Sequence, residues 1–157
     1  MPDLKNVIVF ALGGARWAAE IRYVREVISL GFVTTVPTAP AGIAGVFNLR
    51  GAITPVLDLG PLVGRAAHPA PRQGDGALLL EVDGASAALR LDNVDEIATL
   101  PVSTDAVRDG RGRMVPLIDP PQLLRRALHA AQAVRGDEPP TESRLPVADL
   151  DGDPTLG

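Results

Sequence analysis

The two histidines, His68 and His129, are the side chains best suited to acid–base chemistry in this chain of 157 residues, which contains no cysteine. A catalytic histidine needs a reacting group within hydrogen-bond reach and usually a carboxylate that orients its ring. His68 lies in a stretch rich in Ala, Pro and Gly, and His129 lies in a helical stretch with no partner helix. Because the sequence places no carboxylate close to either ring, we predict that both are surface residues and that the protein is not an enzyme.

Phosphate and metal chemistry are also not supported by the motifs. Gly13-Gly14 is not followed by the residues of a phosphate-binding loop. The acidic stretch 149–153 resembles the start of a calcium loop, but Pro154 stands where glycine is required, and the chain ends before the closing glutamate. We therefore expect no cofactor and no metal, and the lack of cysteine leaves no disulfide framework.

Charge and composition argue against nucleic acid and membrane as partners. The net charge is −4, and residues 136–157 alone carry six acids and one arginine, so that residues 1–135 have a net charge of about +1. Aromatic residues make up 3% of the chain, too few for a base-stacking surface. The uncharged stretch between Glu26 and Arg50 is interrupted by Gly and Pro, which predicts strands and turns and no direct membrane insertion.

The most informative stretch is 48–58, where two short apolar runs meet at Arg50-Gly51. Alternating apolar residues on each side of a glycine that can take positive φ are typical of a β-hairpin. Asp58 follows the second run, and a side-chain oxygen at this position can cap a short helical turn over 59–63. We predict a hairpin with Arg50 at its corner.

Two blocks of the sequence recur. Residues 51–58 match 112–119 in their Gly, Pro and Asp, and residues 12–27 match 82–97 with a slightly different offset. Chance agreement in an Ala-rich chain is the alternative, but two ordered blocks favour an internal duplication. Each half is too small to bury a core of its own, so we expect two all-β units that share one.

The remaining pattern predicts the other elements. For the first half we expect a strand at 7–12, a turn at Gly13-Gly14 and a return strand at 17–21. A helical segment at 22–30 and a further strand at 32–36 should follow. For the second half we expect strands at 77–82, 87–91 and 97–102, an Asp83-Gly84 turn, and a helical turn near Asn93. A helix capped by Asp119 is predicted over 122–136, with Leu124, Ala127, Leu128 and Ala131 on its apolar face.

These elements divide the chain into one folded region and a tail. The folded region covers 4–135, with a first unit at about 4–64, a connector at 65–76, and a second unit with the helix at about 77–135. Residues 136–157 are acidic and rich in proline, and we expect them to be disordered, to take no part in partner contacts, and to be dispensable for folding and binding. The alternative is that Leu145, Val147 and Leu150 form a short docking motif.

The block 45–51 (Gly-Val-Phe-Asn-Leu-Arg-Gly), the following Pro55-Val56-Leu57-Asp58, and the earlier stretch 17–28 resemble the CheW-like coupling proteins of bacterial chemotaxis. The resemblance extends over about 7–131 and is stronger in the first half. It implies a mainly β fold of two intertwined SH3-like five-stranded barrels with a hydrophobic core between them and a short C-terminal helix, which agrees with the duplication.

The resemblance also implies a function and a site. It implies a non-catalytic adaptor in the cytoplasm, recruited to receptor arrays, whose partners are the regulatory domain of a CheA-like histidine kinase and the cytoplasmic tip of a chemoreceptor. Glu26 and Arg50 match positions on the receptor-binding side, where we expect an ion pair that orients Arg50; the alternative is two independent solvated charges. The resemblance further implies a receptor groove lined by Ile21, Val24, Gly45 and Val46, although such apolar side chains often belong to a core.

One segment departs from the family pattern. Residues 101–113, which lead into the last predicted hairpin, are shorter than is usual in the family. This shortening motivates an alternative function, a divergent CheW-like scaffold that has lost one partner surface and tethers a different signalling protein.

Overall fold

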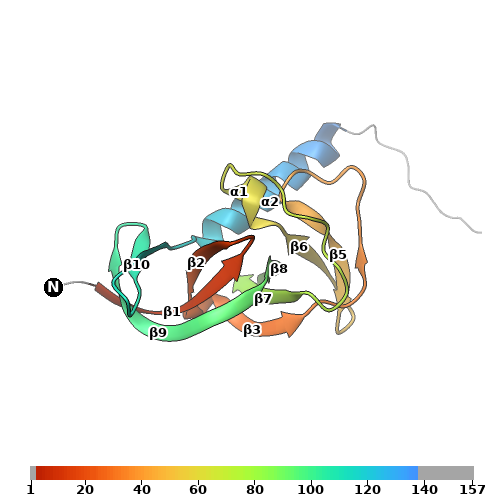
Figure 1. Cartoon of the computed structure of the whole chain (residues 1–157). Coiled ribbons are helices and arrows are strands. Elements are labelled where there is room, and N and C mark those ends of the chain that lie inside the picture. The colour runs from red at the N-terminus through yellow and green to blue at the C-terminus, as the bar shows by residue number, and fades with distance from the viewer. Residues whose placement is uncertain (1–2, 138–157) are drawn as a thin grey trace, which may run out of the picture.

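The computed structural model describes residues 3–137 and is built mainly of β-strands, with a long helix at its C-terminal end (Figure 1). The strands of the first half are β1 Asp3–Leu12, β2 Ala15–Glu20, β3 Val24–Ser29, β4 Val33–Thr34, β5 Ile43–Leu49 and β6 Ala52–Leu57. Those of the second half are β7 Gly76–Val82, β8 Ala85–Leu91, β9 Asn93–Ser103, β10 Ala106–Arg108 and β11 Met114–Pro116. The helices are η1 Ile21–Tyr23, α1 Leu59–Leu62 and α2 Pro120–Asp137.

The strands form two sheets that exchange their hairpins. The first sheet has the order β11-β10-β9-β1-β2, and the second has the order β3-β7-β8-β6-β5-β4. Each sheet therefore combines the leading hairpin of one half of the chain with the later strands of the other half, which is the intertwining that the family resemblance implies. The two predicted units, at about 4–64 and 77–135, are therefore halves of the sequence, and neither unit forms a sheet by itself. The second sheet has six strands and not five, because the short β4 adds to its edge.

The first sheet nearly closes on itself. A bridge joins Ala18 of β2 to Leu117, just after β11, and the Ile118 amide donates to the Ala18 carbonyl at 2.8 Å. These contacts connect the two edge strands of the sheet and leave few unpaired backbone groups between them.

Local turn chemistry explains the predicted hairpins. Arg50 and Gly51 both have positive φ, 50° and 89°, a combination whose twist matches that of paired strands. The Asn48 side chain accepts a hydrogen bond from the Gly51 amide at 2.9 Å and holds this turn. Asp83-Gly84 adopts the same conformation, and the predicted hairpin at 13–14 is also present.

The core has three parts, of which the largest lies between the sheets and is covered by α1 and α2. Two smaller clusters lie within the first and second sheets. In β1, Ile8 and Phe10 face the shared core, whereas Val7 and Val9 face the cluster within the first sheet. This burial on both faces explains why the sequence of β1 is apolar without alternation. The predicted shared core is confirmed.

Three local predictions are wrong. The helical segment predicted over 22–30 is limited to η1, because β3 pairs with β7, as in the pair Val27 and Leu78. The strand predicted over 32–36 is reduced to β4, and the helical turn predicted near Asn93 is the start of β9. For β3 and β9, pairing with a distant strand, β7 and β1 respectively, decides a conformation that local spacing leaves ambiguous.

The shortened segment after β9 forms two strands of three residues each, joined by a tight turn. Asp109 in this turn is 2% exposed at its side chain and accepts from the Arg16 guanidinium at 2.7 Å and from the amides of Arg111 and Arg113 at 2.9 and 2.8 Å. These bonds connect the turn to β2.

We expect Asp109 to make the fold sensitive to acid. The hydrogen bond from Arg16 and the amides of Arg113 and Arg111 lower the pKa of Asp109 from 3.8 to about 2. Because the folded pKa is depressed, this carboxylate stabilises the fold above the unfolded value of 3.8, and the contribution is lost as the pH falls towards 2. Thermal melts of Asp109→Asn should show a melting temperature lowered by several degrees near neutral pH and a shallower loss of stability below pH 4 than in wild type. An unchanged acid profile would contradict this assignment.

Candidate protein-binding site

Glu26 and Arg50 form a two-pronged ion pair on the surface. The Nη1 and Nη2 atoms of Arg50 donate to the Oε2 and Oε1 atoms of Glu26 at 2.9 and 3.0 Å. The Arg50 side chain is 65% exposed and that of Glu26 is 35% exposed. The ion pair predicted from the sequence is therefore confirmed.

The fold positions these two side chains from elements at different places in the sheet. Glu26 lies on the edge strand β3, and Arg50 lies at the corner between β5 and β6, where Asn48 holds the turn. The hydrogen bonds between the two groups lower the pKa of Glu26 and raise the pKa of Arg50. Exposed pairs of this kind add little to stability, so the pair fixes the direction of Arg50 more than it holds the fold.

A second ion pair lies close by. Arg25 donates from Nη1 to both carboxylate oxygens of Glu81 at 3.2 Å, with side chains 57% and 41% exposed. Arg25 is the neighbour of Glu26 on β3, and its charge also contributes to lowering the pKa of Glu26. The two pairs are similar in exposure and composition, which makes Arg25 a matched control for Arg50.

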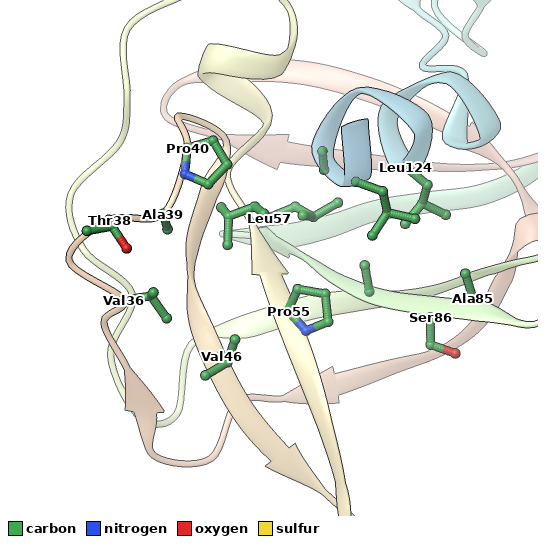
Figure 2. Close-up of a pocket in the computed structure, with 14 residues that line it drawn as sticks. Val36, Thr38, Ala39, Pro40, Val46, Pro55, Leu57, Ala85, Ser86 and Leu124 are labelled. Atoms are coloured by element: carbon green, nitrogen blue, oxygen red, sulfur yellow. The ribbon is translucent and has the colours of Figure 1, made fainter. Parts of the chain in front are cut away.

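The four apolar residues predicted to line a receptor groove differ in their burial and in their neighbours. Ile21 in η1 and Val24 in β3 are half-buried and pack against the core between the sheets. Gly45 is buried beneath β4, since a Cβ atom there would lie 2.7 Å from the Thr34 carbonyl oxygen. Val46 instead lines an apolar groove (Figure 2). Of the four residues, only Val46 lines this apolar groove, and the receptor contact of the four stays a prediction.

The groove that the structure does contain has a volume of about 390 Å³ and is bounded by the loop before β5, the β5–β6 hairpin, the start of β8 and α2 (Figure 2). Its lining residues are Val36, Thr38, Ala39, Pro40, Ile43, Val46, Pro55, Leu57, Ala85, Ser86, Ala87, Leu124, Ala127 and Leu128. The groove is not apparent from the sequence because its walls come from four separate segments, within 36–46, 55–57, 85–87 and 124–128. The available signal was Leu128, an exposed leucine on the apolar face of the predicted helix.

His68 has a carboxylate partner, contrary to the prediction. Its Nδ1 atom lies 2.6 Å from Oδ1 of Asp58, and its amide donates to Oδ2 at 2.7 Å. Asp58 also caps α1 as predicted, by accepting from the Gly60 amide at 3.0 Å. The connector residue His68 is therefore 24% exposed and not a free surface residue.

The surroundings of His68 indicate a structural role. Its Nε2 atom lies against the β1–β2 turn so closely that a Cβ atom at Gly13 would be 2.5 Å away. The ring thus lies between this turn and Asp58, and these contacts hold the connector in place. Among residues 3–137, no group of three His, Cys, Asp or Glu is arranged to hold a metal ion, and no helix there has the length and apolar character needed to cross a membrane.

The chain belongs to the CheW-like domain family, whose model matches residues 6–105. It is 33% identical over 97 residues to the chemotaxis protein CheW of Rhizobium meliloti (strain 1021), and 35% identical over 54 residues to that of Treponema pallidum (strain Nichols). The first alignment covers 61% of this chain and 61% of the relative, and the second covers 34% and 32%.

A solved structure gives the same result at the level of the fold. The scaffolding protein TtCheW of Thermoanaerobacter tengcongensis superposes with a TM-score of 0.60 at 26% identity, covering 76% of this chain and 90% of that one. The family and the fold predicted from the sequence are therefore confirmed. The family match ends at residue 105, before β10 and β11.

Proposed function

We propose that this chain is a non-catalytic adaptor that couples the cytoplasmic tip of a chemoreceptor to the regulatory domain of a CheA-like histidine kinase. Its place would be the cytoplasm, at receptor arrays. Membership of the CheW-like family supports this function, as do relatives named chemotaxis protein CheW and the likeness to a chain described as a scaffolding protein.

The observation that carries the proposal is the ion pair between Glu26 and Arg50. A guanidinium has five N–H donors, and Glu26 engages two of its nitrogens, so further donors remain for a carboxylate or carbonyl of the receptor. The pair holds Arg50 in one direction before binding, which reduces the conformational entropy lost on association. The half-buried Ile21 and Val24 extend the proposed contact beside Glu26, whereas the burial of Gly45 gives it an indirect role beneath β4.

Arg50→Ala is expected to weaken receptor binding by about tenfold or more, as for a well-placed interfacial arginine. The melting temperature should change little, because an exposed ion pair adds little stability. Arg25→Ala removes a similar ion pair nearby and should leave receptor binding close to wild type. Titration calorimetry with a receptor-tip fragment and thermal melts of the three proteins measure these effects. Equal losses of affinity in both variants, or a large loss of stability in Arg50→Ala, would contradict the binding role of Arg50.

A second candidate function is a scaffold that has lost one partner surface. It is favoured by the three-residue strands β10 and β11, which replace the longer hairpin of the first half and lie beyond the region matched by the family. Measuring receptor and kinase binding separately distinguishes the two candidates: the adaptor binds both, and the divergent scaffold binds one.

A further inference from the structure

The groove beside α2 is apolar but lies on the surface. None of its lining side chains carries a charge, and Thr38 and Ser86 are its polar members. It is continuous with the core between the sheets, to which its lining residues Leu57, Leu124 and Ala127 belong, and α2 forms one of its walls. Apolar surface in such a position favours a covering segment.

We propose that the stretch Leu145-Pro146-Val147 of this same chain docks in the groove. These residues lie beyond the described part of the chain, and their place in the sequence allows them to reach it. From Leu128, on the groove wall, α2 continues for nine residues to Asp137, a rise of about 14 Å. The eight residues from Asp137 to Leu145 span up to about 26–29 Å when extended, more than the distance needed to return.

The charges on the two sides are complementary. Residues 138–157 contain five acids and one arginine. The first half of α2, which forms the groove wall, contains the exposed Arg125 and no acid between 120 and 128, whereas Arg126 donates to the Leu62 carbonyl at 2.7 Å. The apolar stretch 145–147 is itself uncharged, which suits a groove without charged lining. Glu142 and Asp149, the nearest acids on the two sides of this stretch, would then lie near Arg125.

Because the chain between α2 and Leu145 joins the segment to its site, a docking motif of weak intrinsic affinity can occupy the groove. A segment joined to its site by a short linker acts at an effective concentration in the millimolar range, so docking requires only an intrinsic affinity in that range. Of the residues predicted to contact the receptor, Val46 lines the groove and Glu26 and Arg50 do not, so docking of the tail leaves the contact at the ion pair free. This inference therefore does not depend on the proposed function.

The absence of cysteine from the chain allows a direct test. Ala148→Cys in the full-length protein gives a single attachment point for a nitroxide, and methyl NMR measures the resulting line broadening. We expect broadening at Val46 and Leu57 in the groove to be several-fold greater than at Val107 and Val115 in the first sheet. Adding Leu145→Ser and Val147→Ser to the labelled protein should abolish the difference, whereas the control Leu150→Ser should preserve most of it.

Two results would overturn the proposal. The first is broadening no stronger in the groove than at the first-sheet methyls. The second is broadening of the groove methyls in isotopically enriched protein without a nitroxide when it is mixed with nitroxide-labelled protein of natural isotopic abundance, since this broadening comes from the tail of a second molecule. Val46→Lys provides an independent check from the groove side, because it should reduce the broadening at Leu57 without any change in the tail.

Discussion

Phe10→Ala is expected to lower the free energy of unfolding by about 3–5 kcal/mol, the usual cost of removing a fully buried aromatic ring. Phe10 lies in the core between the sheets, on a strand that pairs with β2 on one side and β9 on the other. Because β9 belongs to the second half of the chain, the cavity weakens contacts made by both halves. We therefore expect one cooperative unfolding transition at lower temperature, and not the selective loss of one sheet.

Chemical denaturation followed by Trp17 fluorescence and by far-ultraviolet circular dichroism measures this effect. Trp17 contacts the same core, and the circular dichroism signal reports on both sheets. Leu4→Ala is the control, since Leu4 lies on the same strand but is 60% exposed, and its removal should change stability little. Two separate transitions in the Phe10 variant would show that the halves fold independently, against the exchange of hairpins.

Asp58→Ala is expected to destabilise the protein by about 2–3 kcal/mol, because it removes a helix cap and leaves buried donors without acceptors. The carboxylate accepts from the Gly60 amide and binds His68 through both the amide and the ring. Its loss removes the two bonds that hold His68, and with it the connector, beside α1. His68→Ala removes the ring contact but keeps the cap and the amide bond, so it should cost less than Asp58→Ala.

The Asp58 contribution should also depend on pH. Burial acts to raise the pKa of Asp58, but the bonds from His68 and Gly60 outweigh it, and the net pKa lies below 3.8. The stabilisation is therefore present above the unfolded value and is lost as the pH falls through the folded one. Urea titrations of wild type, Asp58→Ala and His68→Ala at several acidic pH values measure this. A wild-type advantage over Asp58→Ala that stays constant into strong acid would contradict the assignment.

Much of the fold could be predicted because its hairpins are local. Turns such as Arg50-Gly51 and Asp83-Gly84 contain residues that tolerate positive φ between apolar runs, and they fold as predicted. The exchange of hairpins between the halves was accessible through the family resemblance but not through spacing, because periodicity carries no information on which distant strand is the partner. The same limit explains β3, whose pairing with β7 overrides a helical spacing.

The candidate site, too, could be predicted only in part. The pairing of Glu26 with Arg50 was predicted from matching family positions, and the structure contains it. The contact of His68 with Asp58 and the apolar groove were not predicted, because both depend on how separate segments pack in three dimensions and not on local spacing. His68 in particular stands ten residues from Asp58 in a connector whose composition indicates exposure, and the contact arises only when α1 and the β1–β2 turn come together.

The central claim, that the chain joins a receptor to a kinase, is tested most directly by co-sedimentation. Vesicles carrying a chemoreceptor tip are mixed with a CheA-like regulatory domain, with and without this protein. We expect the kinase domain to sediment with the vesicles only when the wild-type chain is present, with the effect retained by Arg25→Ala and lost with Arg50→Ala. A chain that binds the vesicles or the kinase domain alone, and does not bring the two together, would contradict the account.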